Sequence, residues 1–157
     1  MARTRDLIPI RLSHLLLTDD GLLKKEMKPS KAIPVDLGIQ VADGEKLKLS
    51  FDHRELWVSF EDWREIRTTF RCLNVISFRW QPIEYFREDE RPDSTYEIID
   101  SEWIQLHEEQ NMIGSAQVAR HYKLNFNAIG CLEVICSEVK TEPDKNTTDS
   151  GGSPVRS

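Results

Sequence analysis

The stretch "HYKLNFNAIGCLEVICSEV", residues 121–139, decides the expected fold, because apolar side chains alternate along both of its halves. Alternation with a period of two is typical of a half-buried β-strand. A three-residue loop at 128–130, closed by Asn127 facing Cys131, uses Gly130 in the left-handed position that such loops need. The expected pairs are Phe126 with Leu132, Leu124 with Val134 and Tyr122 with Cys136 on one face, and Asn125 with Glu133 and Lys123 with Ile135 on the other. The sequence therefore predicts a β-hairpin with one apolar and one mixed face.

The two cysteines of this hairpin, Cys131 and Cys136, are five positions apart. In a regular strand an odd separation places side chains on opposite faces, so these thiols could neither share a metal ion nor form a disulfide with each other. Zinc sites favour closer cysteine spacings together with two further ligands. We therefore expect Cys136 to be a small core side chain, and the sequence predicts no metal site and no cofactor.

Similar alternation upstream predicts a three-stranded meander formed by residues 35–41, 47–51 and 56–60. Its turns set Val41 opposite Leu47, Ile39 opposite Leu49, and Leu49 opposite Val58. One face of the meander is then continuously apolar, which fixes the register of the strands. Residues 74–82 predict another strand, and residues 8–12 predict an edge strand near the start of the chain.

Two helices are expected as well. Within residues 59–73, four apolar side chains recur at the helical spacings of three and four: Trp63, Ile66, Phe70 and Leu73. A second helix is expected to begin near Asp100–Ser101 and to stop near Gly114. The predicted fold is therefore α+β: a single, mostly antiparallel sheet of about six or seven strands, with the helices around 63–73 and 101–112 packed on one face.

Length and composition bound the class of protein. The 157 residues suffice for one domain, which we expect to span residues 1–140, followed by a polar and disordered segment at 141–157. The net charge of −6 argues against nucleic acid as a partner, because such binding depends on Lys and Arg. No secretory signal and no membrane-spanning apolar run are visible. Three cysteines without an export signal favour a reducing, cytoplasmic location.

Signatures of catalysis are weak. The segment "HEEQN", residues 107–111, departs from the zinc motif H-E-x-x-H, because Asn111 stands where the second histidine belongs. Neither a G-x-S-x-G nucleophile motif nor a phosphate-binding glycine pattern is present. Carboxylates are abundant, but nothing in their spacing selects a catalytic pair. We therefore assign no catalytic residue and favour a protein that is not an enzyme.

Charge is distributed unevenly, since the region from Glu84 to Glu109 holds ten acidic residues and only two arginines. Such a region attracts basic partners, and aromatic side chains beside it could anchor an interface. The alternative interpretation is a solvated loop whose aromatic residues fix it to the core. The candidate partner-binding residues are Glu84, Tyr85, Phe86, Glu88, Asp89, Glu90 and Asp93, together with Trp57, which alternation places on the face opposite the core.

The segments "HYKLNFNAIGCLEVI" and "DSEWI" resemble small uncharacterised bacterial α+β families, some of which are similar to immunity proteins of toxin systems. The resemblance covers about a fifth of the chain and transfers no functional residue. It implies a cytoplasmic protein that binds and neutralises a cognate toxin, and an acidic surface would suit a basic toxin.

The favoured function is a non-catalytic binding protein that contacts a basic protein partner through the acidic region. Two alternatives stay open: a small hydrolase-like enzyme with a nonstandard site, and a homodimeric structural subunit joined through the face of Trp57. An enzyme predicts a concave pocket in which at least two titratable groups converge, whereas a protein-binding module predicts a flat or convex acidic face.

Overall fold

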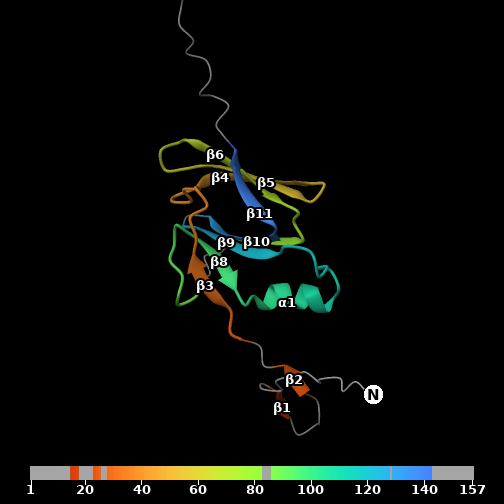
Figure 1. Ribbon diagram of the computed structural model, residues 1–157. Helices are drawn as coiled ribbons and strands as arrows, with labels where there is room; N and C mark the ends of the chain where they lie inside the picture. The colour runs from red at the N-terminus through yellow and green to blue at the C-terminus, as the bar shows by residue number, and fades with distance from the viewer. Residues whose placement is uncertain (1–14, 18–22, 26–27, 83–85, 128, 143–157) are drawn as a thin grey trace, which may run out of the picture.

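The computed structural model describes residues 15–17, 23–25, 28–82, 86–127 and 129–142, and its main body consists of two antiparallel sheets in two layers (Figure 1). The five-stranded sheet has the order β3-β8-β9-β10-β7, and the four-stranded sheet has the order β11-β6-β5-β4. Their bounds are β3 Lys31–Pro34, β4 Glu45–Asp52, β5 Glu55–Glu61, β6 Arg67–Leu73, β7 Ser77–Gln81, β8 Ser94–Ile99, β9 Arg120–Phe126, β10 Gly130–Cys136 and β11 Glu138–Glu142. Strands β1 (Leu15–Leu17) and β2 (Leu23–Lys25) pair with each other, and α1 (Glu102–Glu109) is the one helix in the described ranges.

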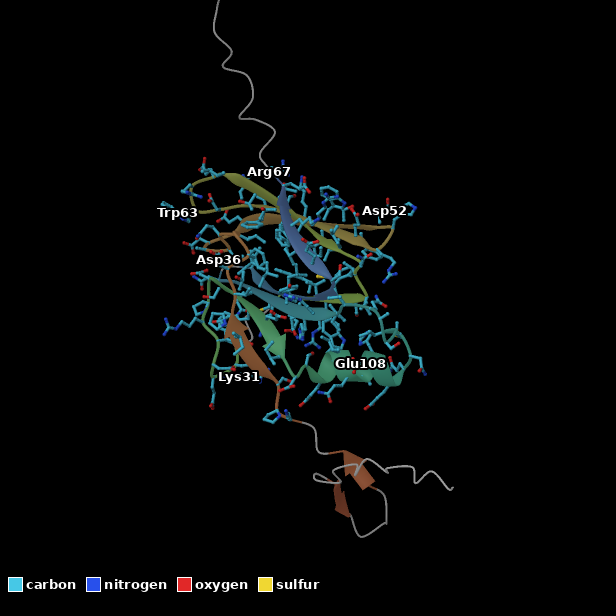
Figure 2. The ribbon with its side chains drawn as sticks, viewed as in Figure 1. Lys31, Asp36, Asp52, Trp63, Arg67 and Glu108 are labelled. Carbon is cyan, nitrogen blue, oxygen red and sulfur yellow. The ribbon has the colours of Figure 1, made fainter. Side chains whose placement is uncertain are left out.

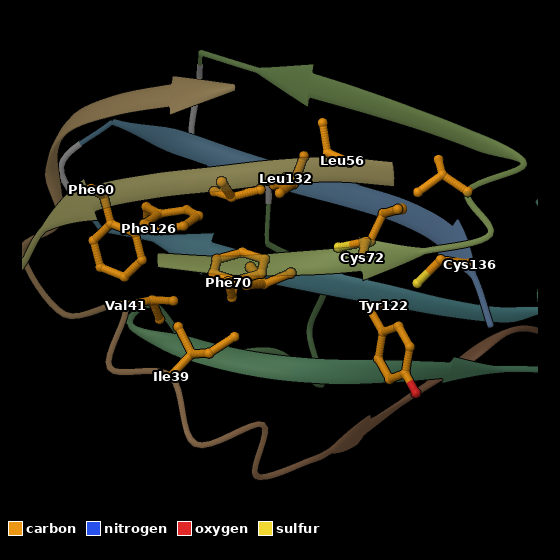
Figure 3. Close-up of a cluster of buried hydrophobic side chains, with 14 residues drawn as sticks. Ile39, Val41, Leu56, Phe60, Phe70, Cys72, Tyr122, Phe126, Leu132 and Cys136 are labelled. Carbon is orange, nitrogen blue, oxygen red and sulfur yellow. The ribbon is translucent and has the colours of Figure 1, made fainter. Parts of the chain in front are cut away.

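The core lies between the two layers, where strands of both sheets turn apolar side chains toward one another (Figure 3). Strands β5 and β6 contribute from one sheet, and β9 and β10 contribute from the other, each with every second residue. Phe60 of β5 meets Phe126 of β9 edge to face, with ring centroids 5.1 Å apart. The buried members are Ile39, Val41, Leu56, Val58, Phe60, Phe70, Cys72, Val75, Tyr122, Leu124, Phe126, Leu132, Val134 and Cys136. Two sheets packed face to face in this way form a β-sandwich.

The predicted α+β fold, with a single sheet and two helices on one face, is therefore wrong. The protein is mostly β, and a second sheet covers the apolar face that the helices were expected to cover. The physical reason lies in the segment after β5. It continues as another alternating strand, β6, so the apolar face becomes as broad as a sheet and is matched by the equally broad face of β9 and β10.

The predicted helix over residues 59–73 is a hairpin formed by β5 and β6. The carboxylate of Asp62 folds the turn, because its Oδ1 accepts hydrogen bonds from the backbone N–H groups of Arg64 (2.9 Å) and Ile66 (3.0 Å). Trp63 is 64% exposed and lies at the outer end of the hairpin (Figure 2), whereas Phe70 is fully buried in the core. The apparent helical spacing arose because Trp63 and Ile66 lie in the turn, whereas Phe70 and Leu73 lie in strand β6.

The predictions for the other strands had mixed outcomes. Leu49 does lie opposite Val58 in the ladder of β4 and β5, and residues 74–82 contain strand β7. Residues 35–41 form no strand, so their predicted pairing with residues 47–49 is wrong. Ile39 and Val41 are nevertheless buried in the core. The predicted edge strand at 8–12 lies outside the described residues.

Strands β9 and β10 form the predicted hairpin, but the pairing is shifted by two residues. Gly130 pairs with Phe126, and Leu132 pairs with Leu124. A shift of two leaves every side chain on its predicted face, so the six side chains expected to point inward all lie in the core. Gly130 has φ 127°, and a Cβ atom there would lie 2.0 Å from the carbonyl oxygen of Gln81. The close approach of β7 therefore requires glycine at this turn.

The chain passes between the two sheets three times, first from β3 to β4 and then twice more at neighbouring points. It leaves β6 for β7 through residues 74–76, and it leaves β10 for β11 through Ser137. The Ser137 N–H donates to the carbonyl oxygen of Leu73 (2.9 Å), and the Asn74 side-chain amide donates to the Ser137 hydroxyl (2.9 Å). Strand β11 includes Thr141 and Glu142, the first two residues of the segment that the sequence predicted to be disordered, and residues 143–157 lie outside the described residues.

The second predicted helix exists as α1, in shorter form. Ser101 is its N-cap, since the Ser101 Oγ accepts a hydrogen bond from the Ile104 N–H (3.2 Å). The helix ends before Asn111, which adopts a left-handed φ of 57°, rather than at the predicted stop, Gly114.

No helix within the described ranges is long and apolar enough to cross a membrane.

Candidate functional site

A cavity of about 540 Å³ lies on the outer face of the five-stranded sheet, on the side away from the four-stranded sheet. Helix α1 lies on this side of the sheet (Figure 1) and contributes one wall, and residues 87–90 contribute another. Eight charged or aromatic side chains line what we call the helix-side cavity: Arg79, Arg87, Glu90, Glu102, Trp103, His121, Lys123 and Glu133. Its volume is in the range of small-molecule sites.

The floor of the helix-side cavity consists of polar side chains that alternate with the core residues of β9 and β10. His121, Lys123 and Asn125 of β9 and Glu133 of β10 point away from the core, and all four are buried. Buried polar groups are stable only when they are hydrogen-bonded or ion-paired, so a floor of this kind requires a connected network.

Glu133 is the centre of the first network. Its carboxylate accepts two hydrogen bonds from the guanidinium of Arg79, from Nε (3.1 Å) and Nη2 (2.7 Å), and lies 3.0 Å from Nε2 of His121. Burial alone would raise the pKa of Glu133, but the hydrogen bonds from His121 and Arg79 lower this pKa to about 2. The carboxylate is therefore ionised at neutral pH, which makes it an acceptor only.

The ionised Glu133 fixes the proton positions on His121. Since Nε2 faces a carboxylate that can only accept, Nε2 carries the proton, and in the neutral ring Nδ1 is then an acceptor. The Ser101 Oγ lies 2.8 Å from this Nδ1, so the serine hydroxyl donates its proton there. The indole of Trp103 contacts the His121 ring (5.1 Å between centroids), and the Arg79 guanidinium lies over the indole (4.6 Å).

Lys123 and Glu90 form the second network. The Lys123 Nζ donates to Oε2 of Glu90 (2.5 Å), and the Asn125 side-chain amide lies 3.4 Å from the same oxygen. Glu90 belongs to the loop between β7 and β8, so this buried ion pair holds that loop against the sheet. Among the described residues, the other carboxylate oxygen of Glu90 and the amide oxygen of Gln81, both from residues that line the cavity, have no hydrogen-bond partner.

The charged groups that solvent can reach in the helix-side cavity are the guanidinium groups of Arg79 and Arg87 and the carboxylate of Glu102. Glu133, Glu90 and Lys123 are buried and paired, whereas the side chains of Arg79 and Arg87 are 49% and 34% exposed. A guanidinium has five N–H donors, and Arg79 uses two of them on Glu133. Arg87 donates to the backbone carbonyl of Ser30 and lies 3.6 Å from Asp89. The remaining donors suit a planar anion such as a carboxylate or a phosphate.

The structure distributes the predicted partner-binding residues over different environments. Glu88 and Asp93 are exposed, and Asp89, also exposed, accepts a hydrogen bond from the Ala32 N–H (3.0 Å). Phe86 is half-buried. Glu90 points inward to Lys123 and is not part of an exposed face. Glu84 and Tyr85 lie outside the described residues.

Trp57, the remaining candidate, lies on the outer face of the four-stranded sheet and is 37% exposed. The Arg71 guanidinium lies over its ring, 5.4 Å from the centroid. Trp57 and the acidic loop belong to different sheets, so the structure does not bring all the predicted contact residues together. A dimer formed through Trp57 stays a prediction.

His107 and the two cysteines of the hairpin, which the sequence singled out, are all buried in the fold. His107 is buried, and its Nδ1 lies 2.8 Å from the carbonyl oxygen of Trp103. Cys136 lies in the core, and Cys131 is buried on the opposite side of β10, as the odd spacing predicted. Within the described part of the chain, no group of three or more His, Cys, Asp or Glu side chains is arranged to hold a metal ion.

Sequence reasoning missed the residues of the helix-side cavity. The hairpin analysis placed Lys123, Asn125 and Glu133 on a mixed surface, and it treated His121 as the start of a strand. The available signal was the strict alternation of polar with apolar residues in "HYKLNFN", combined with an opposing Glu133. That pattern marks a polar face, but only the position of α1 shows that this face is covered.

No family model, curated protein or solved structure matches the chain.

Proposed function

We propose that the protein binds a small organic anion, a carboxylate or a phosphate ester, in the helix-side cavity. The observation that carries this proposal is the pair of partly exposed guanidinium groups, Arg79 and Arg87, in a cavity where Glu90, Lys123 and Glu133 are buried and paired. Glu102, at the start of α1, is the one exposed carboxylate among the described lining residues, so the exposed groups still carry a net positive charge. The floor is organised before a ligand arrives, because Glu133 and Trp103 already orient Arg79. The unpartnered oxygens of Gln81 and Glu90 favour an anion that also carries a hydroxyl or amine donor.

Thermal unfolding in the presence of a panel of anions tests this function. The panel contains simple carboxylates, hydroxycarboxylates, amino acids and phosphate monoesters, and calorimetry then measures the affinity of the compounds that raise Tm. We expect stabilisation of the wild-type protein, and a loss of affinity of about tenfold or more when Arg87→Gln removes one guanidinium.

Arg67→Gln is the matched control, because Arg67 is exposed on β6 in the other sheet and its replacement changes the net charge equally. Equal weakening in both variants would indicate a nonspecific charge effect. A panel in which no compound binds the wild-type protein would contradict the proposal.

A second candidate function is capture of a basic protein partner, such as a toxin, in the cytoplasm. The observation that favours it is the exposure of Glu88, Asp89 and Asp93 along one loop. Reversal of charge at Glu88 and Asp93 should weaken capture of basic proteins from a native lysate at low salt. The change at exposed Glu88 should leave Tm unchanged, whereas Asp93 also accepts a hydrogen bond from the Asn127 N–H (3.3 Å). Binding that is unaffected by these reversals and by salt would remove this candidate.

A further inference from the structure

Three side chains from separate elements form a continuous hydrogen-bonded chain in the helix-side cavity. Ser101 precedes α1, His121 lies in β9, and Glu133 lies in β10. The Ser101 Oγ lies 2.8 Å from Nδ1 of His121, and Nε2 of His121 lies 3.0 Å from Oε2 of Glu133. All three residues line the same cavity.

The direction of the hydrogen bonds matches what a nucleophilic serine requires. An ionised Glu133 accepts from Nε2–H, so the neutral imidazole offers Nδ1 to the serine hydroxyl as a base. The same order of serine, imidazole and carboxylate operates in serine hydrolases, although there the serine usually contacts Nε2 rather than Nδ1. The exchange of the two nitrogens leaves the acid–base roles of the ring unchanged.

The hydroxyl of Ser101 keeps one lone pair for attack on a substrate. Its hydrogen points to His121, and one lone pair accepts the Ile104 N–H that caps the helix. Only 5% of Ser101 is exposed, but the residue lines the helix-side cavity beside Trp103 and His121. A role as helix cap explains the contact between Ser101 and Ile104. It does not explain why a buried imidazole, itself hydrogen-bonded to a carboxylate, lies against the same hydroxyl.

We propose that Ser101 is the nucleophile of an acyl-transfer site in which His121 is the base and Glu133 is a positioning residue, and that the substrate is a carboxylic ester. The class of ester, one bearing a second, anionic group near Arg79 and Arg87, rests on the proposed function. The proposed reactivity of Ser101 does not depend on that function.

The chemical steps balance with water as the co-reactant. The Ser101 Oγ forms a bond to the ester carbonyl carbon, and its proton passes to Nδ1 of His121. The bond from that carbon to the alcohol oxygen breaks, and the alcohol leaves with the proton from His121. Water then attacks the acyl group with His121 as base, which releases the acid and restores the Ser101 hydroxyl.

Covalent labelling with a small alkyl fluorophosphonate, followed by peptide mass mapping, tests the nucleophile directly. We expect one phosphonyl group per chain on Ser101, none on Ser137, and hydrolysis of 4-nitrophenyl acetate by the wild-type protein. Ser101→Asn keeps the helix cap, because asparagine caps helices as well as serine does, but it removes the nucleophile. We expect this variant to be folded, unlabelled and inactive.

Two further variants separate catalysis from structure. His121→Gln should lower the labelling rate by about a hundredfold or more, since it removes the base. Glu133→Gln should lower kcat for 4-nitrophenyl acetate with little change in KM, because the imidazolium formed during acyl transfer loses its anionic partner, and a purely structural role would not separate the two constants. Arg67→Gln should leave rate and labelling unchanged.

Wild-type protein that is folded and unlabelled at Ser101, or that hydrolyses the acetate ester no faster than Ser101→Asn, would overturn the proposal. A comparison of 4-nitrophenyl acetate with the anionic 4-nitrophenyl hemisuccinate tests the ester class separately. Labelling of Ser101 without a preference for the anionic ester would refute the anion site and leave the nucleophile in place.

Discussion

At the scale of the residue, Glu133 links the stability of the floor to pH. Its pKa lies near 2, below the ordinary value of 4.5, because hydrogen bonds from His121 and Arg79 outweigh the effect of burial. A carboxylate whose pKa is lowered by folding contributes stability above its unfolded pKa, and this contribution is lost as pH falls through the folded value. The contribution of Glu133 should therefore be complete above about pH 5 and lost between pH 4.5 and pH 2.

The variant Glu133→Gln tests this linkage. We expect it to lower the free energy of unfolding by about 2 kcal/mol at pH 7, after allowance for solvent screening. The difference from wild type should shrink between pH 4.5 and pH 2, as measured by urea unfolding. A difference that stays constant over this range would show that the carboxylate charge is not what stabilises the floor.

At the scale of the element, the hairpin of β5 and β6 depends on one buried carboxylate. Burial alone would raise the pKa of Asp62, but hydrogen bonds from Arg64 and Ile66 lower it below the ordinary value. The side chain thus supplies turn contacts at a position where the backbone alone would leave N–H groups unsatisfied.

We expect Asp62→Ala to lower the free energy of unfolding by about 1–2 kcal/mol, because two backbone donors lose their acceptor. Asp52→Ala, at the exposed end of β4, is the matched control and should cost less than about 0.5 kcal/mol. Chemical denaturation of both variants gives the comparison. Equal effects would mean that the Asp62 carboxylate does not define its turn.

The elements also show what local patterns can predict. The faces predicted for residues 122–126 and 132–136 are correct despite a register error of two, because an even shift conserves the face. The helix over 59–73 was wrong, because Trp63 and Ile66 lie in a turn and only happen to match the spacing of Phe70 and Leu73. The cavity could not be predicted, since it depends on where α1 lies relative to the outer face of the sheet.

At the scale of the whole molecule, the ion pair of Glu90 and Lys123 joins the loop between β7 and β8 to the centre of the five-stranded sheet. Both side chains are buried, so the removal of either one leaves an uncompensated charge in the interior. This pair therefore holds the wall of the helix-side cavity that carries Arg87.

A double-mutant cycle tests this role. Glu90→Gln and Lys123→Met should each lower the free energy of unfolding by about 3 kcal/mol, and the double variant should lose less than the sum by about 1 kcal/mol or more. The exposed pair Glu138–Lys140 is the control, with an expected coupling below about 1 kcal/mol. Additive losses at Glu90 and Lys123 would contradict the buried pairing.

The most direct test of the helix-side cavity as the functional site is nuclear magnetic resonance of the wild-type protein titrated with the panel anion that raises Tm most. We predict shifts of the Arg79 and Arg87 Nε–Hε signals and of the Trp103 indole signal, and unchanged Nε–Hε signals for Arg64 and Arg67 of the β5–β6 hairpin. Shifts confined to Glu88, Asp93 or other surface residues, or no shift with any anion, would contradict the account.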